Sequence, residues 1–130
     1  MDLAYAAGIV DGEGCFNVGR CRTSFIPRIL VVNTDERLGH WLSRTFGGDV
    51  KKTVVKNKPN WKPRYTWRLS NSRALNLAES LMPYLKLKKA QATVFCAWRD
   101  TQETEGLLVR RKMYEVFKER IAALNRKGRR

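Results

Sequence analysis

The chain has 130 residues, 43% hydrophobic and 10% aromatic, which suffices for one domain with its own core and excludes a mainly disordered chain. Its 26 Lys and Arg residues oppose 12 Asp and Glu residues, and the formal net charge of +14 favours a polyanionic partner, nucleic acid before an anionic membrane surface. No run of about 18 apolar residues could span a bilayer. Because the first residues also lack the basic start of a secretion signal, we expect a cytoplasmic protein, or one of an organellar matrix or stroma, that is not secreted.

The first half of the chain predicts a helix, two strands and a second helix. Residues 3–10 are apolar and rich in alanine, as in a buried helix, and two glycines within 11–14 are expected to end it. Strand-like residues fill 15–21 and 25–32, with a turn between them. Residues 34–48 begin with Thr-Asp-Glu, which is typical of a helix start, and close with two glycines.

The second half repeats the pattern of two strands followed by helices. Tyr65, Trp67 and Leu69 alternate with polar residues, which predicts a half-buried strand over 64–69. The other elements expected here are a strand over 50–56, helices over 71–81, 86–98 and 108–124, a polar linker over 100–106 and a flexible basic tail over 125–130.

This order predicts a single α+β domain over residues 1–130, with an antiparallel four-stranded sheet and helices packed on one of its faces. The other face would be basic. Between residues 15 and 32 there are three cations and no acid, and between 49 and 69 there are seven cations and Asp49 alone. Any one of these cations could serve solubility only, but the imbalance over the whole sheet favours contact with nucleic acid.

Cysteine and histidine do not predict a zinc site. Cys15, Cys21 and Cys96 are an odd number without C-x-x-C spacing, and His40 is the one histidine. We therefore expect three reduced thiols.

One short segment carries a resemblance. Residues 6–14, AAGIVDGEG, resemble the nine-residue signature of the LAGLIDADG homing endonucleases, with Ala7, Gly8, Asp11 and Gly14 matching letter for letter. Small residues let two such helices approach closely, and acids that meet there repel each other unless a divalent cation neutralises them. The competing interpretation is a simple helix end followed by a turn.

The resemblance implies a role for each residue of the segment. Glu13 stands where the family has its metal-binding acid, and the carbonyl of Gly12 is the adjoining metal contact; oxygen ligands suit Mg²⁺, or another divalent cation such as Mn²⁺. Because the signature occurs once, the chain resembles the single-motif members that act as homodimers. The interface residues it implies are Ala4, Ala7, Gly8 and Asp11.

Two further segments are similar to the family. Residues 83–92 look like the stretch that holds a catalytic-site lysine, here Lys88, although Lys88 could also be one of several solvated cations. Asp35 stands where a polar residue positions solvent, although a helix N-terminal acid is an equal alternative. The family's second basic residue aligns with Gly39, so His40 or a strand arginine would have to compensate.

The resemblance implies the saddle-shaped αββαββα fold of the family and a metal-dependent endonuclease that cuts both strands of a long pseudo-palindromic DNA target as a homodimer. The alternatives are a maturase, which would bind RNA, or a DNA-binding regulator of the same fold without cleavage; more distant is a basic structural protein. The residues expected to contact DNA are Asn17, Arg20, Arg22, Arg28, Lys51, Lys56, Arg64, Thr66 and Arg68.

Overall fold

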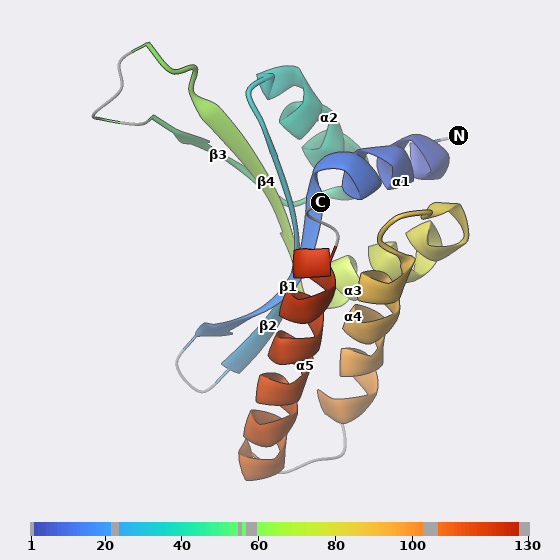
Figure 1. Ribbon diagram of the computed structural model, residues 1–130. Coiled ribbons are helices and arrows are strands. Elements are labelled where there is room, and N and C mark those ends of the chain that lie inside the picture. The colour runs from blue at the N-terminus through green and yellow to red at the C-terminus, as the bar shows by residue number, and fades with distance from the viewer. Residues whose placement is uncertain (1, 22–23, 55, 57–59, 103–106, 128–130) are drawn as a thin grey trace.

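The structure is a computed structural model that describes residues 2–21, 24–54, 56, 60–102 and 107–127 (Figure 1). No helix in these ranges is both long and apolar enough to cross a membrane. The elements, in chain order, are α1 (Asp2–Glu13), β1 (Gly14–Cys21), β2 (Ser24–Asn33), α2 (Glu36–Phe46), β3 (Asp49–Thr53), β4 (Arg64–Ser70), α3 (Asn71–Leu81), a 3-10 turn η1 (Met82–Tyr84), α4 (Lys89–Gln102) and α5 (Leu107–Lys127).

The four strands form one antiparallel sheet in the order β1-β2-β4-β3, with the helices gathered on one side of it (Figure 1). Ile29 of β2 pairs with Phe16 of β1 and with Leu69 of β4 across the central three strands. All three side chains are buried, so this face of the sheet carries the core. The opposite face is not covered by any described helix, as the sequence predicts (Figure 1).

The helices close the core from that one side. Trp67 of β4, which has no exposed surface, is the largest fully buried side chain, and its indole N–H donates to the Gly47 carbonyl at 2.8 Å. Phe95 of α4 packs against Phe16 with ring centroids 5.2 Å apart. A smaller cluster joins Val18 of β1 to Tyr114 and Phe117 of α5, together with Val94 of α4.

Glycines permit the close passage from α2 to β3. Gly47 and Gly48 have φ values of +91° and +93°, which side chains with a Cβ rarely adopt. A Cβ on Gly48 would lie 2.4 Å from the Arg68 carbonyl oxygen. The backbone just before β3 therefore passes the backbone of β4 without room for a side chain.

Several element boundaries correct the sequence-based expectation. α1 does not stop at residue 10 but continues through Gly12 to Glu13, and β3 ends at Thr53, which leaves Lys56 in a turn. α4 begins three residues later than predicted, and residues 100–102 lie in this helix rather than in a linker. α5 continues to Lys127, into the segment expected to be a flexible tail. The expected turn at 22–23, residues 103–106 of the linker and the tail residues 128–130 lie outside the described ranges.

Candidate active site and nucleic-acid interface

The end of α1 is joined to the segment before α4 by one carboxylate. Asp11 Oδ2 accepts from the backbone N–H of Lys86 at 2.7 Å, and Oδ1 accepts from those of Leu87 and Lys88 at 3.1 and 3.0 Å. The carbonyl of Lys88 accepts the N–H of Ala92, so Lys88 is the N-cap of α4 and its N–H is one of the helix donors that lack partners in their own helix, while Lys86 and Leu87 lie just before it. Asp11 therefore fixes the segment that leads into α4, which lies 75 or more residues away in sequence.

These bonds hold Lys88, the lysine predicted from the sequence, at the backbone next to Glu13, the predicted metal-binding acid. The Lys88 ammonium donates to the carbonyl oxygen of Gly14, the residue that follows Glu13. Lys88 is half-buried, and desolvation lowers the pKa of its amine, while the nearby Cys15 and Asp11 oppose that shift. A partly desolvated ammonium interacts more strongly with negative charge beside it than an ammonium in bulk water does.

Glu13 is exposed at the last position of α1. Its Oε2 accepts a hydrogen bond from Asn33 Nδ2 at 2.6 Å. The described residues contain no group of three or more His, Cys, Asp or Glu side chains able to hold a metal ion by themselves. Because Mg²⁺ keeps several waters and needs one or two carboxylates beside substrate phosphates, an exposed acid next to the exposed Gly12 fits half of such a site.

Asp35 acts as a helix N-terminal acid, the alternative interpretation that the sequence left open for it. It is the N-cap of α2, and its Oδ1 accepts the backbone N–H of Arg37 at 2.9 Å. The Arg37 guanidinium also donates to both carboxylate oxygens, at 3.1 and 2.8 Å. These bonds from Arg37 lower the pKa of Asp35 from 3.8 to about 2. A solvent-positioning role stays a prediction.

Asn33 links the two acids, and the sequence reasoning did not single it out. While its Nδ2 donates to Glu13, its Oδ1 accepts the backbone N–H of Asp35 at 2.7 Å. The available signal was an asparagine two residues before a helix cap, a common turn pattern that is not specific to a site.

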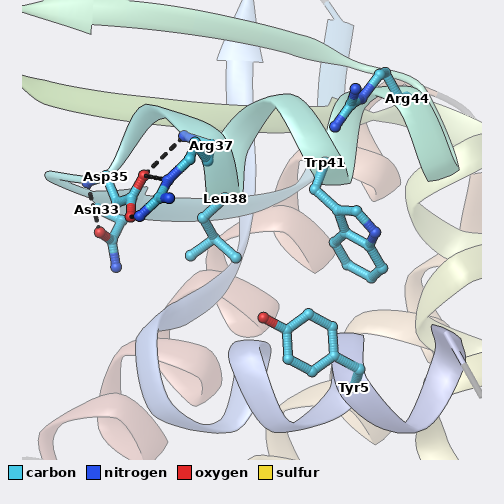
Figure 2. A pocket seen from close by; sticks show the side chains of 7 residues that line it. All are labelled: Tyr5, Asn33, Asp35, Arg37, Leu38, Trp41 and Arg44. Carbon is cyan, nitrogen blue, oxygen red and sulfur yellow. Dashed lines mark hydrogen bonds and ion pairs between the residues drawn. The ribbon is translucent and has the colours of Figure 1, made fainter.

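An open hollow lies between α1 and the start of α2 (Figure 2). Tyr5 of α1 points toward Trp41 of α2, with the rings edge to face at 5.0 Å. Asn33, Asp35 and Arg37 lie at the other end of the same hollow, linked by the hydrogen bonds drawn in the figure (Figure 2). The hollow thus joins an aromatic surface to the polar groups beside Glu13.

The predicted interface residues divide into two groups. Ala4 and Gly8 are exposed on α1, and neither Gly8 nor Gly12 has an atom of another residue within 4 Å of where a Cβ would stand. Ala7 has no exposed surface and packs in the core of its own chain, and the Asp11 carboxylate is engaged by residues 86–88. The expectation for Ala7 as a contact with a partner is corrected, because it faces the core of its own chain, while Ala4, Gly8 and Gly12 face outward. For Asp11, which is partly exposed, an interface role stays a prediction.

Most of the predicted DNA contacts share the open face of the sheet. The strand register pairs Asn17 with Arg28, and Lys51 with Thr66, on the side opposite the buried Ile29 and Trp67. Arg64 and Arg68 lie on that same side by alternation along β4.

The predictions for the remaining cations have varied outcomes. Lys56 is exposed beyond the end of β3. Arg20 pairs with Phe25 at the outer end of β1, but its side chain is not described, and Arg22 lies wholly outside the described ranges. Gly39 is buried, and a Cβ there would stand 3.2 Å from Val50, so the position aligned with the family's second basic residue has little room for a side chain.

Arg28 lies across the neighbouring strand. A Cβ on Gly19 would stand 1.7 Å from Arg28 Nη2, so the guanidinium occupies the space above that glycine. Arg28 Nε and Asn17 Oδ1 are buried and have no hydrogen-bond partner among the described residues. A donor and an acceptor are therefore held side by side on the open face, with their bonding capacity unused within the fold.

No family model matches the sequence, and no curated protein matches it. Among solved structures, the chain is similar to the homing endonuclease I-CvuI in complex with an uncleaved DNA target in the presence of Mg, with a TM-score of 0.77 and 21% identity over 95% of this chain and 81% of that one. It is also similar to the archaeal intron-encoded homing endonuclease I-Vdi141I complexed with DNA, with a TM-score of 0.69 and 14% identity over 92% and 83% of the two chains. A third likeness is to the LAGLIDADG meganuclease I-AabMI bound to uncleaved DNA, with a TM-score of 0.65 and 16% identity over 91% of this chain and 44% of that one. At these identities the likeness shows a shared fold, and the predicted α+β fold is confirmed.

Proposed function

We propose, for a chain that has the LAGLIDADG homing-endonuclease fold, that it is a site-specific endonuclease that hydrolyses both strands of a long double-stranded DNA target with the help of a divalent cation. The observation that carries this proposal is that Asp11 and Gly14, which flank Glu13 in α1 and β1, both bind Lys88. Asp11 fixes the backbone of residues 86–88, and the Lys88 ammonium donates to the carbonyl oxygen of Gly14, the residue after Glu13. A lysine from the second half of the chain is thereby held at the backbone next to the acid Glu13, beside an open basic sheet, and this arrangement suits phosphodiester hydrolysis.

The residues at this end of α1 divide the chemistry between them. Glu13 and the carbonyl of Gly12 would hold the divalent cation, Mg²⁺ or a similar ion such as Mn²⁺, which when bound supplies an activated water and charge neutralisation at the phosphate. Lys88 would stabilise negative charge as it develops on the phosphate, and partial burial strengthens that interaction. Position 39, where the family resemblance implies a second basic residue, is a glycine. Arg37 would take that place, because it is hydrogen-bonded to Asp35, which is linked through Asn33 to Glu13.

A homodimer would complete the site. One chain provides one exposed acid, and the outward face of α1 is free of bulk at Gly8 and Gly12, so two copies of the helix could approach closely. The chain spans 44% of I-AabMI, so two copies together approach the length of that single chain. A two-fold dimer would place a second Glu13 near the first and would read a pseudo-palindromic target.

The open face of the sheet would bind the DNA. Its cations would supply phosphate contacts, and Asn17 and Arg28, which are paired across β1 and β2 on this face, would be placed to contact base edges. A basic antiparallel ribbon can enter the major groove, where each base pair presents a distinct pattern of donors and acceptors.

A maturase or a DNA-binding regulator is the second candidate. It is favoured by the position of Gly39, which is packed against Val50 and leaves little room for the basic residue that the family resemblance implies there. Such a protein would use the same sheet on RNA or DNA without cutting it.

The deciding experiment is cleavage of a randomised target library with Mg²⁺ by the wild type, Glu13→Gln and Glu36→Gln. Glu36 is an exposed acid in the first turn of α2 and serves as the matched control. We expect enriched double-strand cuts at one long pseudo-palindrome, lost in Glu13→Gln and kept in Glu36→Gln. Selective binding without cutting, with any divalent metal, would favour the maturase or regulator. Loss of cutting in both variants would contradict the role given to Glu13.

A further inference from the structure

Asn33 is bound on both sides by groups that fix the direction of its side-chain amide. The Nδ2 group donates to Glu13 Oε2 at 2.6 Å, and Oδ1 accepts the N–H of Asp35 at 2.7 Å. Rotating the amide by half a turn would place its oxygen against the carboxylate and its NH₂ against a backbone N–H. Both bonds would be lost, so the NH₂ group is held toward Glu13.

From this geometry we propose that Asn33 is a positioning residue for the Glu13 carboxylate. The proposal rests on the proposed function, in which Glu13 holds a divalent cation. Asn33 occupies one carboxylate oxygen, Oε2, while Oε1 accepts no hydrogen bond from the described residues. The asparagine therefore orients Glu13 with one oxygen engaged by the protein and the other available to an ion.

Glu13 needs such a partner more than a shorter acid would. A glutamate has one more methylene group than an aspartate, and an exposed one samples many rotamers. Glu13 is exposed, and Asn33 is its one hydrogen-bond partner within the described chain. Holding a ligand through a second residue commonly raises metal affinity by fixing its orientation before the metal arrives.

Asn33 also joins this acid to the sheet and to α2. It is the last residue of β2, directly after Val32 on the strand that carries Arg28, and its oxygen begins the turn into the Asp35 cap. The competing explanation is that Asn33 serves this turn alone and meets Glu13 incidentally. Two substitutions separate the explanations. Asn33→Ser keeps a hydroxyl that can accept from a backbone N–H two residues on but is too short to reach Glu13, and Asn33→Leu loses both bonds.

The first test uses the metal-free protein and does not depend on any activity. In an NMR spectrum of ¹⁵N-labelled protein, the Asn33 side-chain NH₂ signals should shift clearly in Glu13→Ala and remain in place in Glu36→Ala. Equal shifts in the two variants, or none in Glu13→Ala, would overturn the contact on which the proposal stands, whatever the protein does to DNA.

The second test measures the Mg²⁺ concentration for half-maximal cleavage, and the Ca²⁺ concentration for half-maximal stabilisation of target binding without cutting. Asn33→Ser and Asn33→Leu should both raise these concentrations roughly tenfold, while the rate at saturating metal changes less. Thr34→Val, at the exposed neighbour of Asn33, is the matched control and should leave both concentrations unchanged.

A double-substitution cycle completes the argument. Glu13→Asp shortens the acid so that Asn33 cannot reach it, and adding Asn33→Ser to that variant should have no further effect on the metal requirement. An additive effect would show that Asn33 acts through the α2 turn and would overturn the proposal. So would an effect of Asn33→Leu that is absent from Asn33→Ser. If no variant or wild-type protein cuts DNA, the proposed function fails, while the NMR result still decides the contact.

Discussion

Asp11 and Lys88 are joined by a hydrogen bond of 3.0 Å, from the backbone N–H of the lysine to Oδ1 of the acid, across 77 positions of sequence. The same carboxylate receives the N–H groups of Lys86 and Leu87. The lysine then turns its ammonium back to the carbonyl of Gly14. The end of α1 and the segment before α4 are thus joined by hydrogen bonds next to Glu13.

Replacing Asp11 should destabilise the fold. Asp11→Ala leaves the N–H groups of residues 86–88, just before α4, without their acceptor, which we expect to cost about 2 kcal/mol, or about 8 °C in Tm. Thermal unfolding followed by circular dichroism measures the change. Asp49→Ala is the control, because its exposed pairing with Arg68 at 3.9 Å contributes little. An equal loss in the two variants would contradict this role of Asp11.

Replacing Lys88 should separate stability from chemistry. Burial already lowers the pKa of the amine, so Lys88→Met removes a charge that the fold disfavours as well as the bond to Gly14, and the net change in stability should stay within about 1 kcal/mol. Single-turnover cleavage should fall about 10²–10³-fold with target affinity nearly unchanged. Lys86→Met, at an exposed lysine two residues earlier, should keep the cleavage rate. Equal losses of rate in the two variants would refute the assignment.

The titration of Asp35 has a definite sign. Hydrogen bonds from Arg37 hold the pKa of Asp35 at about 2 instead of 3.8. The ionised carboxylate therefore stabilises the folded state fully above pH 3.8, and this stabilisation is lost as the pH falls through about 2. NMR detection of the carboxyl carbon should place the midpoint there. Arg37→Ala should move it toward 3.8. Arg44→Ala, at another arginine of the same hollow, should not move it.

A larger side chain on the outward face of α1 should weaken the association of two copies of this chain. A side chain at Gly8 meets nothing within 4 Å in its own chain, and glycine is unfavourable inside a helix, so Gly8→Leu should raise the stability of the monomer by about 0.5–1 kcal/mol. The same change should weaken the dimer, because two helices could then not approach closely. Sedimentation at several concentrations measures this. Ala97→Leu on the exposed face of α4 should leave association unchanged, and so would Gly8→Leu if α1 lay outside the interface.

Two neighbouring lysines on β3 test the binding face of the sheet. The register places Lys51 beside Thr66 on the open face and Lys52 beside Tyr65 on the other, although both are exposed. Lys51→Ala should reduce the slope of log affinity for DNA against log salt concentration by about 1, and Lys52→Ala should leave it unchanged. Equal slopes for the two variants would place the DNA elsewhere.

The sequence was sufficient to predict the fold where local patterns decide it. Alternation at Tyr65, Trp67 and Leu69 predicted β4 and its buried face, and the Asp35 and Gly47 boundaries of α2 followed from cap chemistry. It misplaced the end of α1, because Gly12 remains helical with open space around it, whereas glycine near a helix end usually signals termination. The neighbouring Asp11 is bound by the backbone of residues 86–88, a tertiary contact that a local pattern does not contain.

The candidate site was predictable in part. The resemblance selected Glu13 and Lys88, but residue types and spacing could not show that Asp11 would bind the backbone of residues 86–88, since that contact depends on how distant elements pack. Arg28 lying over Gly19 was likewise beyond prediction, because the direction of a long side chain is set by the neighbouring strand. Asn33 was missed because its bond to Glu13 joins residues 20 positions apart in sequence, while its bond to Asp35 is a common local turn pattern.

The bond between Asp11 and Lys88 also has a temporal side. During synthesis the acid is made 77 residues before the lysine, an interval of about 4–15 s at the usual rates of translation. All four strands precede residue 71, so every residue of the basic surface is synthesised before the lysine that binds the acid. The helices α3, α4 and α5 that cover the other face of the sheet are made last, so the chain carries its full set of strand cations before it can close its core.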